Sequence, residues 1–154
     1  MQSPTDYRFV TEVIGEKAPY YAYASIRPHD DWLQRKMGRL CLRLANHLQP
    51  HHVYDATATM ADYVSAGCKK AVIDCTPPQG HVDMAILRAT QPYEHLRHLM
   101  HDGSVLVCTY THEAPQQWEK LLADNTFNVT FDLYYCGIAI ADKHRSANHY
   151  IVNF

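Results

Sequence analysis

The sequence predicts an α/β fold: a Rossmann-like, mostly parallel sheet with helices on both faces and an antiparallel strand pair at the C-terminal end. Two patterns support this prediction. From His51 onward, short apolar runs of strand length alternate with helical segments, as in parallel sheets with right-handed crossovers. Near the end, apolar and polar residues alternate up to Tyr135, and an almost wholly apolar run follows Gly137. About six strands are expected.

The length of 154 residues is that of a single domain, with an N-terminal arm over residues 1–28 and an α/β core over residues 30–154. Alternating residues between Tyr7 and Val13 favour a short strand in the arm. The aromatic segment Pro19–Tyr23 is interpreted as packing on its own domain. The alternative is that this segment packs on a second subunit.

A helix is predicted to begin at the capping residues Asp30 or Asp31 and to run to about Leu48, before Pro50. Its apolar residues recur at steps of three and four and so share one face. Three arginines lie on another face, which we interpret as solvated rather than as a binding surface. These are Arg35, Arg39 and Arg43.

The rest of the core is predicted to alternate strands and helices before the closing strand pair. The closing pair is expected to join residues 127–142 to residues 148–154, with Gly137 as a bend in the longer strand. Earlier strands are expected at residues 52–56, 70–75, 83–87 and 104–108, and helices at residues 59–66, 93–100 and 115–123.

Composition excludes several classes of function. A formal net charge of -2 without blocks of like charge gives no electrostatic footprint for nucleic acid or an anionic membrane. No leader-like segment or membrane-spanning apolar run is present. The five cysteines show no Cys-x-x-Cys spacing, which indicates reduced thiols and a cytoplasmic location.

The C-terminal half carries a more specific pattern. Val129–Ile138 contains an Asp-Leu-aromatic bend followed by Gly-Ile, and Trp118 lies on the preceding helix. The helix that contains Arg39 to Leu44 precedes the first strand. With these features, residues 30–154 resemble class I S-adenosylmethionine-dependent methyltransferases. The resemblance is to their small-molecule O-methyltransferase-like branch. Because only eight residues, Cys75–Val82, separate Asp74 from the next strand, the resemblance implies that the family's third strand is deleted.

The resemblance assigns three residues to cofactor binding, if such binding is retained. Asp55 matches the acidic residue that opens the family's glycine-rich turn, and Thr57 follows it within that turn. Asp74 matches the residue that binds the ribose hydroxyls. No glycine occurs between Asp55 and Gly67, although a close backbone approach to a ligand requires one.

The family's catalytic acids are replaced in this chain. Arg88 lies where the resemblance would place an acid, and Thr109 and Tyr110 replace the acidic pair that ends the following strand. No metal is expected, because these side chains do not supply the several hard oxygen ligands that a divalent ion needs. A candidate cleft is formed by five residues: Cys75, Arg88, Thr109, Tyr110 and His112. Arg88, Tyr110 and His112 are expected to converge there and to bind a small anion.

Two further types of chemistry are considered. His95, His98 and His101 recur at steps of three and His51 adjoins His52, but such a series drifts around a helix and predicts no zinc site. Cys75 or Cys108 with His112 is a candidate nucleophile pair; buried inert thiols are the commoner case.

The favoured interpretation is a methyltransferase-like protein that has lost S-adenosylmethionine binding and catalysis. It would act as a scaffold, a partner-binding protein or a small-anion-binding protein, with no cofactor and an unknown protein partner or itself as a homodimer. The alternative is an active S-adenosylmethionine-dependent O-methyltransferase with an atypical cofactor pocket. Fold alone does not decide between them.

Overall fold

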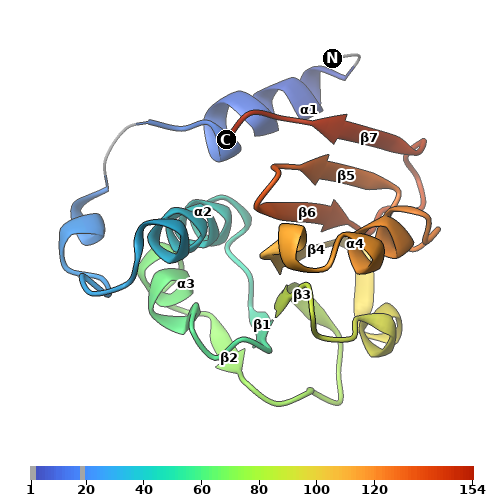
Figure 1. Cartoon of the computed structure of the whole chain (residues 1–154). Helices are drawn as coiled ribbons and strands as arrows, with labels where there is room; N and C mark the ends of the chain where they lie inside the picture. Colours follow the sequence, from blue (N-terminus) through green and yellow to red (C-terminus); the bar gives the residue numbers. More distant parts are fainter. Residues whose placement is uncertain (1–2, 18–19) are drawn as a thin grey trace.

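The computed structural model describes residues 3–17 and 20–154, and within them a mixed sheet is flanked by helices (Figure 1). The strand order is β2-β1-β3-β4-β6-β5-β7. The strands are β1 (His52–Asp55), β2 (Val72–Asp74), β3 (Val82–Arg88), β4 (Met100–Thr109), β5 (Val129–Asp132), β6 (Cys136–Ile140) and β7 (Asn148–Ile151). The helices are α1 (Pro4–Arg8), η1 (Phe9–Ile14), η2 (Tyr21–Ala24), α2 (Trp32–Leu48), α3 (Ala61–Gly67), η3 (Glu94–His98), η4 (Thr111–Glu113) and α4 (Pro115–Leu122).

The sheet is mostly parallel, as predicted. Strands β2, β1, β3 and β4 pair in parallel, and β5 pairs in parallel with β7. Strand β6 lies between β4 and β5 and runs antiparallel to both. The α/β class is therefore confirmed, with seven strands in the described residues instead of about six.

The sheet separates two hydrophobic cores. Alternate residues of β3, such as Met84 and Ile86, contribute to the core under α2 and α3. Their neighbours Ala85 and Leu87 contribute to the core under η3 and α4. This alternation places helices on both faces of the sheet, as predicted.

An antiparallel strand pair lies near the C-terminus, as predicted, but its two strands are β5 and β6 and not residues 127–142 with residues 148–154. Residues 127–142 form no single strand, because a tight turn divides them into β5 and β6, which pair antiparallel with each other. In this turn Tyr134 takes a positive φ of 73° and its N–H donates to Asp132 Oδ1 at 2.9 Å. Strand β7 then pairs in parallel with β5, placing Asn148 opposite Val129.

Gly137 lies inside β6 and makes room for a tryptophan. A Cβ atom at this position would lie 2.2 Å from the ring of Trp118. The indole is buried, and its Nε1–H donates to Asp132 Oδ2 at 3.2 Å. The glycine therefore serves close packing between α4 and the sheet, not the strand bend that the sequence suggested.

Helix α2 begins and ends as its capping residues predict. The side chain of Asp31 accepts a hydrogen bond from the N–H of Gln34 at 2.8 Å, and Gln49 ends the helix in the left-handed conformation. The arginine row departs from the solvated face that we expected. Arg43 is only 7% exposed and donates to the carbonyl oxygens of Val13 and Ile14.

The N-terminal segment is helical, so the strand predicted near Tyr7–Val13 is wrong. Ser3 caps α1, and Pro4 follows at a position where its missing N–H costs nothing. Buried Asp6 accepts hydrogen bonds from Arg145 at 2.5 Å and from Tyr150 at 2.7 Å. These contacts hold α1 beside β7 (Figure 1).

The aromatic arm lies on α2 of its own chain where it is described. Pro19 lies outside the described residues. The Tyr20 and Tyr23 rings stack with centroids 5.3 Å apart, and the Arg39 guanidinium lies 4.7 Å from the Tyr23 ring centroid. Among the described helices, none is long and apolar enough to cross a membrane.

Candidate functional site

A small crevice lies where β1, β3 and β4 end, at the edge of the sheet where open α/β folds place ligands. It encloses about 270 Å³. The structure brings four of the predicted site residues to this crevice: Thr57, Arg88, Thr109 and Tyr110. The other lining residues are Gln34, Thr59, Thr90 and Gln91.

Asp55 lies at the end of β1, but its carboxylate is used within the protein. The side chain is fully buried, and Oδ1 accepts from the Thr57 N–H at 3.1 Å and from the Thr57 hydroxyl at 2.5 Å. The second oxygen accepts from the Met60 N–H at 2.9 Å. Ala58 adopts a left-handed φ of 57° in the same turn, a conformation that costs a non-glycine residue energy. The carboxylate therefore holds together the turn that would carry glycines in a cofactor-binding protein.

Gln34 of α2 lines one side of the crevice. Its side-chain amide donates to the Thr59 hydroxyl at 3.0 Å, and its oxygen accepts from the Tyr110 hydroxyl at 3.0 Å. Burial raises the pKa of Tyr110, so the phenol remains a neutral donor. The chain from Tyr110 through Gln34 to Thr59 links β4, α2 and the turn after β1, and it occupies polar groups that a ligand would need.

Arg88 is paired at the crevice mouth. Its guanidinium makes two hydrogen bonds of 2.8 Å to the carboxylate of Glu113 and lies 4.1 Å from the centroid of the Tyr110 ring. The Glu113 carboxylate thus already holds the group that the sequence assigned to anion capture. His112 belongs to a neighbouring aromatic cluster, with its ring centroid 5.1 Å from that of Tyr135.

Asp74 does not join this crevice. It is exposed at the end of β2 and lines a separate hollow of about 490 Å³ with His52 and the connection to β3. The two acids that the resemblance assigns to a cofactor therefore have different surroundings. Asp55 is buried in hydrogen bonds, and Asp74 is open to solvent.

The proposed cysteine nucleophiles lack the environment that activates a thiol. Cys108 is buried, and desolvation raises its pKa to about 12. Cys75 is exposed, but it follows β2, and strands β1 and β3 lie between β2 and β4. That separation is about 14 Å at ordinary strand spacing. Cys75 is therefore out of reach of His112, which follows β4.

The histidines are spread over separate surroundings. Within residues 3–17 and 20–154, no group of three or more His, Cys, Asp or Glu side chains is placed to hold a metal ion. His101 lies in β4, because this strand begins at Met100 where the sequence predicted the end of a helix. Its Nε2 lies 2.7 Å from Asp83 Oδ1, and Asp83 also accepts from the N–H groups of His51 and His52.

The His101–Asp83 pair predicts a pH dependence of stability. The hydrogen bond to Asp83 raises the pKa of His101, so the pair stabilises the fold below about pH 6.5 and this contribution disappears as pH rises through the folded pKa. Burial alone would raise the pKa of Asp83, but the hydrogen bonds that its carboxylate accepts outweigh burial and lower this pKa. Its contribution is therefore lost only at acidic pH. His101→Gln should cost less than about 1 kcal/mol near pH 5.5, because both groups are partly exposed.

Urea unfolding of the wild type and of His101→Gln at several pH values measures this effect. The difference in unfolding free energy should shrink between pH 5.5 and pH 8.5. A difference that stays constant or grows with pH would show that a charged His101 does not stabilise the fold. His144→Gln is the control. His144 also lies beside an acid, Asp102, but it is 82% exposed, so this pair should contribute little to the unfolding free energy at any of these pH values.

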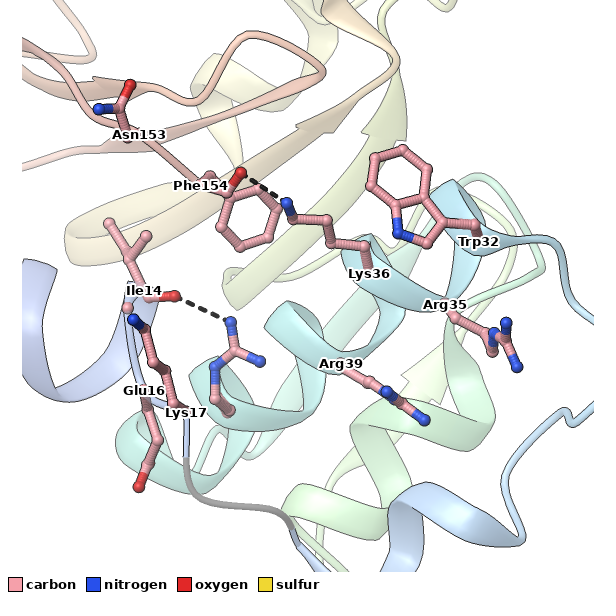
Figure 2. A pocket seen from close by; sticks show the side chains of 11 residues that line it. Ile14, Glu16, Lys17, Trp32, Arg35, Lys36, Arg39, Asn153 and Phe154 are labelled. Atoms are coloured by element: carbon pink, nitrogen blue, oxygen red, sulfur yellow. Dashed lines mark hydrogen bonds between the residues drawn. The ribbon is translucent and has the colours of Figure 1, made fainter.

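A second pocket, which the sequence did not predict, lies between α2, the segment after η1 and the end of the chain. It encloses about 500 Å³ and is rich in cationic side chains (Figure 2). The arginine row of α2 is visible in the sequence. The segments that turn this row into a pocket are Gly15–Lys17 and Asn153–Phe154, which only the tertiary fold brings to α2.

The fold and these sites define an α/β protein with a mixed sheet, a hydrogen-bonded crevice at the strand ends and a cationic pocket on α2. No protein-family model matches the sequence, and no curated protein is significantly similar to it.

Proposed function

We propose that this chain is a methyltransferase-like protein that has lost S-adenosylmethionine binding and catalysis, and that it acts by binding a protein partner or a small anion. The observation that carries the proposal is the filling of the crevice at the strand ends. Both carboxylate oxygens of Asp55 accept hydrogen bonds from Thr57 and Met60, and Gln34 links Tyr110 to Thr59. A cofactor would have to break these bonds before it could form its own.

The arrangement of elements supports the methyltransferase part of this proposal. A helix precedes a parallel series of strands, and an antiparallel pair lies beyond them, as the resemblance implies. Strand β2 is an edge of the sheet, and β3 pairs with the opposite side of β1. The connection from Cys75 to His81 has no helix or strand of its own. This agrees with deletion of the third strand of the family plan.

The size of the crevice supports the loss of the cofactor. Pockets for small molecules and cofactors usually enclose about 300–1,000 Å³. The crevice, at about 270 Å³, falls below this range. Methyl transfer further requires the methyl donor to be held in line with its acceptor. Among the described residues no acidic side chain lines the crevice, and the nearby carboxylates are engaged: Asp55 accepts hydrogen bonds in its own turn and Glu113 is paired with Arg88.

One observation favours the alternative, an active O-methyltransferase with an atypical pocket. Asp74 is exposed at the end of β2 and lines a hollow of about 490 Å³. In this alternative Asp74 binds the ribose hydroxyls, and the cofactor lies along β2 and the connection to β3 instead of in the crevice.

Calorimetric titration with S-adenosylmethionine and S-adenosylhomocysteine tests the two functions. We expect no saturable heat up to about 1 mM ligand from the folded wild-type protein. Asp74→Ala provides the control. Micromolar binding by the wild type that disappears in Asp74→Ala would overturn the proposal and establish the alternative pocket.

A further inference from the structure

The pocket on α2 concentrates positive charge in a protein that is slightly negative. Five of the 14 lysines and arginines line it, whereas Glu16 is the one acid in the lining, out of 16 in the chain. A concave site lined by one sign of charge focuses the field and attracts a ligand of opposite sign. The cationic lining residues are Lys17, Arg35, Lys36, Arg39 and Arg43.

Arg43 lines the pocket and is buried, and the groups that accept its hydrogen bonds carry no negative charge. Its guanidinium donates to the carbonyl oxygens of Val13 at 2.8 Å and Ile14 at 2.9 Å, and to the hydroxyl of Tyr23 at 3.2 Å. All three acceptors are neutral. Within the part of the chain that the structure describes, no carboxylate lies within 4.0 Å of its nitrogens. Buried charges are normally paired, so an anion in the pocket would complete this site.

Two more arginines line the same pocket. Arg35 and Arg39 project from neighbouring turns of α2, and neither forms an ion pair with a described residue (Figure 2). The carboxylate of Glu16 accepts from the Tyr20 hydroxyl at 2.9 Å. The N–H groups of Arg35 and Arg39 therefore remain available to bind a ligand, with one face of the Arg39 guanidinium against the Tyr23 ring.

The pocket also has an apolar side. The Lys36 ammonium lies 5.3 Å from the Trp32 ring centroid and 4.6 Å from that of Phe154, and it donates to the main-chain oxygen of Phe154 at 2.5 Å. The indole of Trp32 is 59% exposed. Figure 2 shows the Lys36 chain lying between these two rings. A ligand whose anionic group meets the arginines could therefore place an apolar or planar group against the exposed indole.

We infer that this pocket is a binding site for a small organic phosphate, a molecule that carries a multiply charged phosphate group and a planar group. Guanidinium groups bind phosphate oxygens through paired hydrogen bonds, which explains why arginines and not lysines dominate the α2 side. The inference specifies the small-anion part of the proposed function. It uses none of the crevice residues, so it does not depend on whether the chain binds S-adenosylmethionine.

The test is calorimetric titration with pyrophosphate and with ADP at constant ionic strength. Arg35→Gln combined with Arg39→Gln should weaken the binding of both probes at least 10-fold, because both side chains line the pocket. Lys69→Gln combined with Lys70→Gln is the matched control: it removes the same charge from exposed positions and should change affinity less than 2-fold. ADP should bind more tightly than pyrophosphate, and Trp32→Ala should reduce this difference.

Three results would overturn the inference. The first is no saturable binding of either probe up to about 5 mM. The second is equal weakening by the Arg35/Arg39 and Lys69/Lys70 pairs, which would indicate general charge attraction. The third is competition between S-adenosylhomocysteine and ADP, which would place the ligand in a cofactor site. That third result would also contradict the proposed function, whereas the first two would leave the loss of the cofactor unaffected.

Discussion

Replacing Asp55 with alanine is expected to lower the free energy of unfolding by about 3 kcal/mol. The carboxylate is fully buried and accepts hydrogen bonds from the Thr57 N–H, the Thr57 hydroxyl and the Met60 N–H. Alanine would leave these donors unsatisfied in the interior, next to the left-handed Ala58. Urea unfolding at neutral pH, monitored by circular dichroism, measures the change.

Two further variants make this test specific. Asp55→Asn keeps the shape but places an N–H₂ group against a backbone N–H, so it should cost about 2 kcal/mol. Asp62→Ala removes an exposed acid of α3, which makes only a 3.8 Å contact with Arg27, and should cost less than about 0.5 kcal/mol. If Asp55→Ala were as stable as Asp62→Ala, the carboxylate would not hold the turn and would be available to a ligand.

The second large effect is expected at Gly137. Gly137→Ala should cost about 2–3 kcal/mol, because the added methyl group would lie 2.2 Å from the buried ring of Trp118 and the central strand β6 cannot move away. The same urea experiment measures this loss. Gly80→Ala is the matched control, since no atom lies within 4 Å of a methyl group there.

A double-variant cycle assigns the cost at Gly137 to its contact with Trp118. In a Trp118→Leu background, Gly137→Ala should cost at least 1 kcal/mol less than in the wild type. Equal costs in the two backgrounds would show that the strain arises from the backbone of β6 and not from the tryptophan.

The alternation of strands and helices in the core was predictable because each of these elements has its own local sequence pattern. Helix α2 has a capping Asp31 and an apolar face, and its bounds were predicted nearly to the residue. The pairing of β5 and β6 was not predictable in this way. Their turn contains one turn-forming residue, Asp132, which accepts from the Tyr134 N–H, but no glycine, asparagine or proline before Gly137, so the sequence reads as one continuous strand.

The N-terminal helix had a local signal that the alternation between Tyr7 and Val13 obscured. Ser3 followed by Pro4 is a typical helix start, and Phe9, Val10 and Val13 recur at helical spacing. Tertiary packing decides between a helix and a strand in this segment. The Phe9 and Phe131 ring centroids lie 5.0 Å apart, a contact between residues at opposite ends of the chain.

The residue types in the two pockets were visible in the sequence, but their partners were not. Tyr110 and Gln34 are 76 positions apart and share a hydrogen bond that closes the crevice. Arg43 occupies the predicted row on α2, yet the two carbonyl oxygens that accept from it lie about 30 positions earlier, in η1. Such contacts depend on tertiary packing, which periodicity along one helix does not encode.

The central claim is that the crevice at the strand ends no longer accepts S-adenosylmethionine. The most direct test is an NMR titration of ¹⁵N-labelled protein with S-adenosylhomocysteine to about 2 mM, following the backbone amides of residues 55–60, 74–75 and 109–110. The account predicts that these resonances do not move, because the groups of the crevice are already bonded within the protein and Asp74 lies outside it. Saturable shifts centred on Asp55, Thr57 and Asp74 would contradict it and show that the chain still binds the cofactor.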